Sequence, residues 1–300
     1  MPMISAAVSI RKRFFYAATW METNKSAGIM PSFAETAALN LDTLRKSTPV
    51  VHAITNFVTM GWVADVLAAV GASPLMADAP DEVEAAVTLA DALILNLGTL
   101  NPARLNVIRT AGFQAAALGR PVVLDPVGAG ALSPRTEAAR ALLDAFPVRV
   151  LRANASEMMA LTDHTVRSRG MDTAHPVDAA QAMAGELAAG LGLTTVVTGA
   201  EDLLTTGRRW GRIANGHVRM ARVPGTGCAA GALIGAFLAV DPDPFAAALS
   251  ALVCLNLAGE TAARKTTGAG SFKVALIDAL DTLTPAQVRR DARINTGDSP

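Results

Sequence analysis

The segment Pro224–Gly231 reads Pro-Gly-Thr-Gly-Cys-Ala-Ala-Gly and precedes an apolar helical stretch at 232–240. Its two flanking glycines allow a ligand to approach the backbone closely, and the first free N–H groups of a helix attract anions. A phosphoryl group in transfer carries negative charge that such donors stabilise. A glycine-rich turn that only begins a buried helix has the same pattern, so the wider sequence must decide. We predict an anion hole formed by Gly225, Thr226, Gly227 and Cys228.

Two carboxylates follow apolar runs and are placed to act near a phosphate. Asp125 ends the run Pro-Val-Val-Leu at 121–124 and precedes a turn that contains glycine. Magnesium prefers hard oxygen ligands and keeps several waters, so Asp125 suits a magnesium site, although an Asx-turn gives the same pattern. Glu157 follows the next run, where Asn154 or Ser156 could cap a helix and Glu157 could complete the capping arrangement. Glu157 would face the same cleft as Asp125 if the two strands are neighbours.

These residues lie at the ends of short β-rich runs that alternate with Ala- and Leu-rich stretches at helical spacing. The runs are 50–54, 93–97, 121–125, 148–152 and 194–198. Apolar strands separated by helices predict a mostly parallel sheet with helices on both faces. Ligands of such sheets bind beyond the carboxyl ends of the strands. The polar residues there are Asn56, Asn96, Asp125, Asn154, Glu157 and Thr198.

The rest of the chain favours one domain. Residues 203–220 predict a turn-rich hairpin with turns at Thr206–Gly207 and Asn215–Gly216, and no linker divides the chain. We divide the chain into an N-terminal extension at 1–35, which we expect to be disordered, one domain at 36–288, and a polar tail at 289–300, which we expect to fray. Three further helices are expected at 225–240, 244–265 and 272–283.

Composition favours small ligands over macromolecular partners. The 26 basic and 26 acidic residues leave no net field for nucleic acid, and no run of about 20 uninterrupted apolar residues predicts a membrane span. Two distant cysteines, Cys228 and Cys254, form neither a disulfide framework nor a CxxC pair, as is typical of a reducing cytosol. We expect a cytoplasmic protein with no nucleic-acid or membrane partner.

Ten segments in order resemble the hydroxyethylthiazole kinase family of the ribokinase-like superfamily, from about Thr48 to Leu283. They are VHAITNFVTM (51–60), GASPLMAD (71–78), LILNLGTLN (93–101), PVVLDPVGAGA (121–131), RANASE (152–157), VVTG (196–199), NGH (215–217), PGTGC (224–228), AGE (258–260) and GSF (270–272). The resemblance implies a three-layer α/β ribokinase-like fold, with a central, mostly parallel sheet flanked by helices. It also implies a homotrimer with active sites at subunit interfaces.

The resemblance further implies a function and its residues. The expected reaction is magnesium- and ATP-dependent phosphorylation of the hydroxyl of 4-methyl-5-(2-hydroxyethyl)thiazole in thiamine salvage. The implied roles are substrate binding by Met76, Asn56 and Gly225, ATP binding by Arg152, Thr198 and Asn154, Mg²⁺ binding by Asp125 and Glu157, and catalysis by Cys228.

Most enzymes of the ribokinase-like superfamily have an aspartate at the position of Cys228. This chain resembles the thiazole kinases, which have a cysteine there. A thiol at a helix N-terminus is expected to have a lowered pKa, although a nearby triphosphate would raise it again. Cys228 is therefore a base, a group that only positions the acceptor, or a small buried apolar residue.

Three other functions compete with this interpretation. One is a kinase for another hydroxyalkyl heterocycle, of the hydroxymethylpyrimidine or pyridoxal type. A nicotinamide-dependent oxidoreductase would need GxGxxG after the first strand, which the sequence lacks. The third is a binding protein that has lost catalysis, against which Asp125, Glu157 and Cys228 argue.

Overall fold

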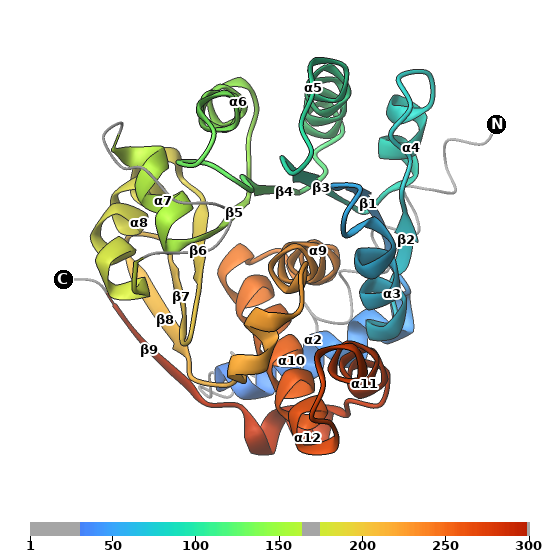
Figure 1. The fold of residues 1–300 in the computed structure, drawn as a ribbon, viewed down its shortest axis with the longest axis vertical. Coiled ribbons are helices and arrows are strands. Elements are labelled where there is room, and N and C mark those ends of the chain that lie inside the picture. The colour runs from blue at the N-terminus through green and yellow to red at the C-terminus, as the bar shows by residue number, and fades with distance from the viewer. Residues whose placement is uncertain (1–30, 164–174, 299–300) are drawn as a thin grey trace.

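One nine-stranded sheet runs through residues 31–163 and 175–298, the part of the chain that this computed structural model describes (Figure 1). Its strands lie in the order β2-β1-β3-β4-β5-β6-β7-β8-β9. They are β1 (Val50–Ile54), β2 (Ser73–Leu75), β3 (Ala92–Asn96), β4 (Val122–Asp125), β5 (Val150–Asn154), β6 (Thr194–Thr198), β7 (Asp202–Thr205), β8 (Arg209–Ile213) and β9 (Ile294–Asp298).

The six strands from β2 to β6 pair in parallel, which confirms the predicted mostly parallel sheet. Strands β3 and β4 are buried at every position. Such burial requires cover on both faces, and it explains why these strands read as continuous apolar runs instead of alternating ones.

The remaining three strands are antiparallel, and they include the predicted hairpin. β7 and β8 join through a turn in which Gly207 has a φ of +82°, a conformation that favours glycine. β9 then pairs with β8, from Arg209 opposite Asp298 to Ile213 opposite Ile294. The expectation of a frayed tail is therefore wrong for residues 289–291, which end a helix, and for residues 294–298, whose backbone completes the edge of the sheet. Residues 299–300 lie outside the described residues.

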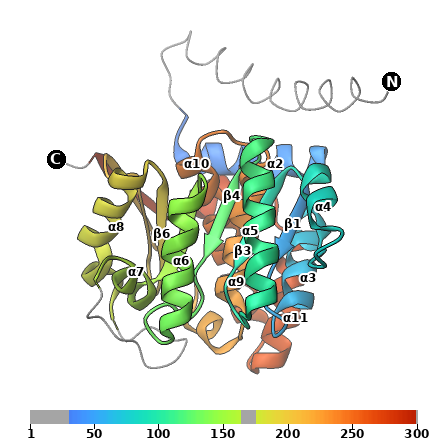
Figure 2. The same cartoon turned by 90° about the horizontal axis from the view of Figure 1, so that it is seen from above.

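Helices cover both faces of the sheet in the described residues. Figure 2 shows α4, α5 and α6 side by side over one face, and Figure 1 shows α9 inside the arc formed by the strands. The helices are α2 (Phe33–Ser47), α3 (Met60–Val70), α4 (Val83–Leu89), α5 (Pro102–Ala117), α6 (Ser133–Ala145), α7 (Ala155–Thr162), α8 (Val177–Leu191), α9 (Thr226–Leu238), α10 (Pro244–Lys265), α11 (Ala269–Asp281) and α12 (Pro285–Asp291), with a 3₁₀ turn η1 (Val218–Arg222).

Two apolar cores hold these layers together. One joins α2, α3 and α9–α12 to the concave face of the sheet, and the other joins α4–α8 to the opposite face. Helix α9 lies directly on β3, because a Cβ at Gly235 would be 3.0 Å from Cγ1 of Ile94. The sheet and its two helical layers form the expected three-layer α/β architecture.

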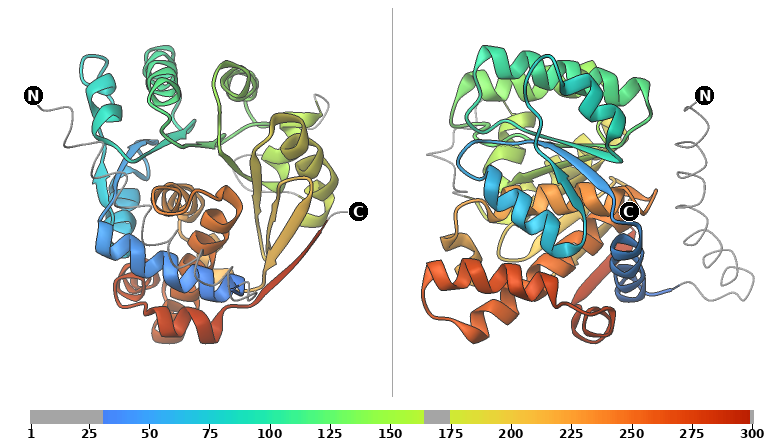
Figure 3. Two further views of the ribbon diagram at one scale, coloured as in Figure 1. Left: turned by 180° about the vertical axis from the view of Figure 1, so that it is seen from behind. Right: turned by 90° about the vertical axis from the view of Figure 1, so that its right-hand side faces the viewer.

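Helix α2 lies partly within the segment assigned to the N-terminal extension, of which residues 1–30 lie outside the described residues. The Ser32 side chain accepts the N–H of Glu35 and caps the helix. The buried Asn40 donates to Asp241 (2.7 Å) and to Ser250 (3.1 Å), which ties α2 to the α9–α10 connection. Figure 3 shows α2 beside α10 and α12, against which it packs. The ordered fold therefore begins by Phe33, before the predicted boundary.

Helix α10 is long and apolar enough to cross a membrane by length and composition. Its most apolar window is 89% buried inside the protein, as expected for the central helix of a core. It is the one described helix that meets both criteria.

Candidate active site

Polar side chains line one edge of the sheet, where the parallel strands end. Asn96 at the end of β3 lies opposite Asp125 at the end of β4. Asn154 and Thr198 are likewise opposite each other at the ends of β5 and β6. The parallel pairing therefore brings together side chains that the sequence separates by up to about a hundred positions, as predicted for ligand sites of such sheets.

The N-terminus of α9 opens beside this edge. Its N-cap, Gly225, has a φ of +96° and no side chain to accept a hydrogen bond from the helix. The Thr226 hydroxyl turns back and donates to the carbonyl oxygens of Met220 and Val223, both at 2.9 Å. In the described part of the chain, the N–H groups of Gly227 and Cys228 have no protein acceptor. The helix end therefore retains two donors for an anion.

This arrangement leaves fewer free N–H donors than the four predicted for the anion hole. The N–H of Thr226 already donates to the carbonyl of Val223, at 3.3 Å. Thr226 therefore shapes the turn with both its side chain and its amide. Of the four residues in the predicted anion hole, Gly225, Gly227 and Cys228 have N–H groups with no protein acceptor among the described residues, whereas the N–H of Thr226 is occupied.

Arg152 lies directly in front of the same helix end. Its guanidinium donates to Asp125 (Nη1 to Oδ1, 3.2 Å) and to the Thr198 hydroxyl. A Cβ at Gly227 would lie 2.7 Å from Nη1 of Arg152. The glycine therefore makes room for the guanidinium, and the positive charge lies beside the helix end that carries the free amides. A planar guanidinium beside unpaired N–H groups suits phosphate oxygens.

A chain of amide hydrogen bonds connects Asp125 to Cys228. The backbone N–H of Gly98 donates to Oδ1 of Asn96 (3.0 Å), which turns Nδ2 of Asn96 toward Asp125 (2.7 Å) and toward the Cys228 sulfur (3.3 Å). The N–H of Thr59 likewise donates to Oδ1 of Asn56 (3.1 Å). Nδ2 of Asn56 then faces Oδ1 of Asn96 (3.1 Å) and the Cys228 sulfur (3.3 Å). The sulfur thus accepts two amide hydrogen bonds.

Burial governs the charges of the two carboxylates. Burial raises the pKa of Asp125, against the opposing effects of Arg152 and Asn96. Burial also raises the pKa of Glu157 to about 7, with Arg152 opposing and Asp125 assisting that shift. Burial alone would lower the pKa of Arg152, but the charges of Asp125 and Glu157 outweigh it and raise that pKa. The site therefore holds two carboxylates and one fixed cation with little solvent to screen them.

The Cys228 thiol differs from its expected state. Burial raises its pKa, and the negative charge of Asp125 raises it further, against the effects of Thr59, Arg152 and Asn96. The prediction that the helix N-terminus lowers this pKa is wrong because desolvation dominates. At neutral pH the residue is a thiol.

Asp125 and Glu157 offer a donor set that fits magnesium. Glu157 forms the predicted capping box with Asn154 on α7, and its Oε1 also accepts the N–H of Gly128 at 2.9 Å. No cluster of three His, Cys, Asp or Glu side chains occurs among the described residues. Two carboxylates suffice for an ion that keeps several waters and binds phosphate oxygens as well.

Comparison with known proteins agrees with this geometry. The model of the hydroxyethylthiazole kinase family matches residues 41–286. A hydroxyethylthiazole kinase of Desulfotalea psychrophila is 44% identical over 265 residues, covering 88% of this chain and 97% of that protein. One from Cereibacter sphaeroides strain ATCC 17023 is 47% identical over 254 residues, covering 85% and 96%. This chain belongs to the hydroxyethylthiazole kinase family.

Solved structures place this member of the hydroxyethylthiazole kinase family within the ribokinase-like fold. A hydroxyethylthiazole kinase protein from Pyrococcus horikoshii OT3 superposes with a TM-score of 0.81 at 38% identity, covering 87% of this chain and 98% of that one. A pyridoxal kinase from Staphylococcus aureus superposes with a TM-score of 0.58 at 15% identity, covering 83% and 98%. The second likeness concerns the fold alone.

The other residues predicted for this thiazole-kinase family member lie along the same edge. Met76 directly follows β2, which is paired with β1, and it packs half-buried against the concave-side core. Buried His52 donates from Nε2 to the carbonyl oxygen of Ala77 at 2.7 Å. It thereby holds the segment after Met76, and burial lowers its pKa. The proposed substrate, ATP and metal residues stay predictions.

Two residues close to the site received no role from the sequence. Asn96 was recognised only as a polar residue after a strand, although it contacts both Asp125 and Cys228. The sequence assigned no role to Arg104, on α5, because an arginine near the start of a helix is usually a solvent-exposed charge. Its contacts with the loop after β1 and the loop after β2 form only in the folded chain.

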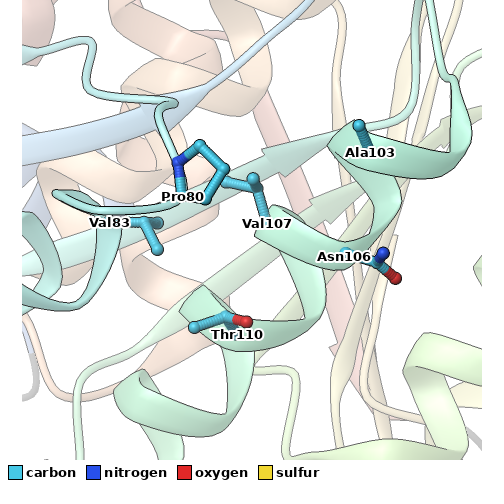
Figure 4. A pocket seen from close by; sticks show the side chains of 6 residues that line it. All are labelled: Pro80, Val83, Ala103, Asn106, Val107 and Thr110. Carbon is cyan, nitrogen blue, oxygen red and sulfur yellow. The ribbon is translucent and has the colours of Figure 1, made fainter.

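A separate cavity of about 240 Å³ lies between α4 and α5, on the far face of the sheet from α9 (Figure 4). Its lining carries no charged side chain and consists of Pro80, Val83, Ala103, Asn106, Val107 and Thr110. It has nothing to hold a triphosphate, so we do not assign the kinase site to it.

Gly227→Ala tests the contact between Arg152 and the start of α9. We expect kcat/KM for ATP to fall about 10- to 100-fold, because the new methyl displaces the guanidinium from the helix end. The melting temperature should change little, since an arginine side chain can move and alanine favours a helix. Gly190→Ala in α8, where nothing lies within 4 Å, is the matched control and should leave activity unchanged. Equal activities of Gly227→Ala and Gly190→Ala would show that the contact between Arg152 and the start of α9 does not matter for ATP use.

Asp202 gives a prediction about pH and stability. Burial raises its pKa from 3.8 to about 6, while Asn256 (2.7 Å) and the N–H of Gly199 (3.0 Å) oppose that shift. Between these values the folded state binds a proton that the unfolded state has lost, so stability falls as pH rises. In Asp202→Asn this loss, about 3 kcal/mol between pH 4 and 7, should disappear. Urea unfolding at both pH values measures it, with exposed Glu186→Gln as control. Parallel curves for wild type and Asp202→Asn would refute it.

Proposed function

We propose that this protein transfers the γ-phosphoryl group of ATP to the hydroxyl of 4-methyl-5-(2-hydroxyethyl)thiazole, with magnesium, as a step of thiamine salvage. The observation that carries the proposal is the uncapped N-terminus of α9, which has free amides at Gly227 and Cys228 and has Arg152 and Asp125 packed against its first two turns. Family membership supports the reaction, and this geometry supports the proposed site.

The γ-phosphoryl group is proposed to bind at the two free amides. Phosphoryl transfer proceeds largely through positioning and electrostatic stabilisation of a loose transition state. The N–H groups of Gly227 and Cys228 would donate to the equatorial oxygens, and Arg152 would offset their charge. Because Asp125 and Thr198 hold the guanidinium, it needs little rearrangement to act.

The acceptor hydroxyl is proposed to lie next to Cys228, between that residue and the loops that carry Asn56 and Met76. Asn56 and Asn96 both donate to the sulfur, so the S–H hydrogen must point away from them. A thiol held in this way orients the hydroxyl more readily than it removes its proton. We therefore propose that Cys228 positions the acceptor, and that its own proton stays on the sulfur.

Magnesium is proposed to bind at Asp125 and Glu157. When bound, the ion neutralises charge on the phosphates. Asp125 also anchors Arg152, and Glu157 also fixes the start of α7 and the turn at Gly128. The two carboxylates thus organise the surrounding protein as well as offering oxygen ligands.

The direct test combines purified protein, magnesium-ATP and hydroxyethylthiazole, with the products read by phosphorus NMR and mass spectrometry. We expect a thiazole monophosphate and ADP in equal amounts, and no thiazole monophosphate from the Cys228→Ala, Asp125→Ala double variant. Hydroxymethylpyrimidine and pyridoxal serve as rival acceptors in the same assay. Faster turnover of either rival would assign the enzyme to that heterocycle, and binding without ADP formation would indicate a non-catalytic protein.

Substitutions of Cys228 distinguish a base from a positioning group. We expect Cys228→Ser to lower kcat less than about tenfold, because a hydroxyl still accepts from both asparagines, whereas losing a general base costs about 100-fold or more. Cys228→Asp should keep or raise the rate, since the superfamily commonly has aspartate there. Steady-state kinetics measure both. An inert aspartate variant, or a 100-fold loss in the serine variant, would contradict the proposed role.

The assembly and the compartment stay predictions. We propose a homotrimer with active sites at subunit interfaces and a cytoplasmic location, on the basis of the family resemblance. Light scattering coupled to size-exclusion chromatography would measure the assembly; a monomer with full activity would contradict it.

A further inference from the structure

Arg104 is buried in the first turn of α5, where a cation is electrostatically disfavoured. Its side chain is 4% exposed, and its backbone N–H donates to the Asn101 cap at 2.9 Å. The N-terminus of a helix carries partial positive charge, so an arginine there is destabilising unless other contacts compensate it. A residue that breaks a local rule and stays buried usually serves another purpose.

The contacts of Arg104 reach two loops at the edge of the sheet. Nη2 donates to the carbonyl oxygen of Thr55, and Cζ lies 4.6 Å from the centre of the Phe57 ring. Nη1 donates to Asp78 at 3.0 Å. One guanidinium therefore joins the loop after β1 to the loop after β2.

The two joined loops carry the residues proposed to bind the acceptor. Thr55 and Phe57 flank Asn56, whose side chain contacts the Cys228 sulfur. Asp78 lies two residues after Met76, and His52 donates a hydrogen bond to the carbonyl oxygen of the intervening Ala77. Holding the backbone before Asn56, the Phe57 ring after it and the Asp78 carboxylate beyond Met76 restrains the spacing of the two loops.

We propose that Arg104 is a positioning residue that sets the acceptor pocket by clamping the Thr55–Phe57 loop to Asp78. The proposal rests on the proposed function, because the clamped loops matter only if they bind the thiazole. Among the described residues, the hydrogen bonds and the cation–π contact of Arg104 are made with Thr55, Phe57, Asp78 and the Asn101 cap, none of which is proposed to bind phosphate. Its loss should therefore affect the two substrates differently.

The test varies each substrate at saturating concentration of the other in wild type, Arg104→Met, Arg104→Lys and Asp78→Asn. We expect Arg104→Met to raise KM for hydroxyethylthiazole roughly tenfold, with KM for ATP within about twofold of wild type. Arg104→Lys should recover part of the loss, because it keeps the ion pair with Asp78 but cannot also reach Thr55 in a planar fork. Exposed Arg109→Met on the same helix is the matched control.

Hydrogen exchange of the ligand-free protein separates this proposal from the proposed function. In Arg104→Met, peptides covering 55–59 and 76–79 should exchange faster than in wild type and in Arg109→Met. Unchanged exchange in both loops, or equal increases of both KM values, would overturn the clamp. Wild type that never phosphorylates the thiazole would instead overturn the proposed function, and the pocket assignment with it. Should Arg104→Met fail to fold, Arg104→Lys and Asp78→Asn carry the same comparison.

Discussion

Arg152→Met should lower kcat/KM for ATP by about 1,000-fold, the size of effect seen when an arginine that stabilises a transferring phosphoryl group is lost. Arg152 is the cation that bridges Asp125 and Thr198 and faces the start of α9. Methionine keeps much of the side-chain volume but supplies neither charge nor donors. Steady-state kinetics with varied ATP measure the loss.

The same substitution leaves Asp125 buried without its ion-pair partner, which costs about 3 kcal/mol or more when the carboxylate is charged. Burial already raises the pKa of Asp125, and the loss of Arg152 removes an opposing effect. Lowering the pH should therefore protonate Asp125 in the variant and restore part of the lost stability. Arg149→Met, at an exposed residue just before β5, is the matched control and should retain both activity and stability. Near wild-type activity in Arg152→Met would contradict a role for Arg152 in stabilising the phosphoryl group.

Asp125→Asn should lower kcat about 100- to 1,000-fold, the scale found when a preorganised electrostatic group is lost. Asparagine offers one acceptor where Asp125 uses two, because Oδ1 accepts from Arg152 and Oδ2 from Asn96. Asn96 cannot turn to compensate, since its own Oδ1 accepts from Gly98 and Asn56. In the variant an amide NH₂ group replaces one carboxylate oxygen. That group cannot accept a hydrogen bond, so it faces the N–H donor of Arg152 or of Asn96 without pairing with it.

Asp125→Asn should also need a higher magnesium concentration for half-maximal rate. Asp144→Asn, at an exposed position on α6, controls for a change of net charge. Titrating magnesium at fixed ATP in both variants gives the comparison. An Asp125→Asn enzyme with unchanged magnesium dependence would show that Asp125 serves only to hold Arg152.

Sequence patterning was sufficient for the parallel strands β1 and β3 to β6 because those strands are buried on both faces. The run at 194–198 is apolar or β-branched throughout and corresponds to β6 at its exact bounds. β2 escaped notice because it has only three residues and includes Pro74. β9 escaped because its residues, Ile294 to Asp298, are mostly polar, and only pairing with β8 makes them a strand.

The site was predictable where a side chain ends a strand and less so where a loop crosses from elsewhere. Asp125 and Thr198 follow from strand ends alone, and the Asn154–Glu157 capping box follows from residue spacing. The pKa of Cys228 was misjudged because burial beside Asp125 cannot be read from a helix start. The contacts of Arg104 join residues up to 49 positions apart, so only the folded chain reveals them.

A crystal structure with magnesium, a non-hydrolysable ATP analogue and hydroxyethylthiazole tests the central claim most directly. We expect γ-phosphate oxygens at about 3 Å from the backbone nitrogens of Gly227 and Cys228, a distance typical of N–H···O hydrogen bonds. We also expect the Arg152 guanidinium against the same phosphate. A γ-phosphate bound away from this helix end, with water alone on the two amides, would contradict the claim.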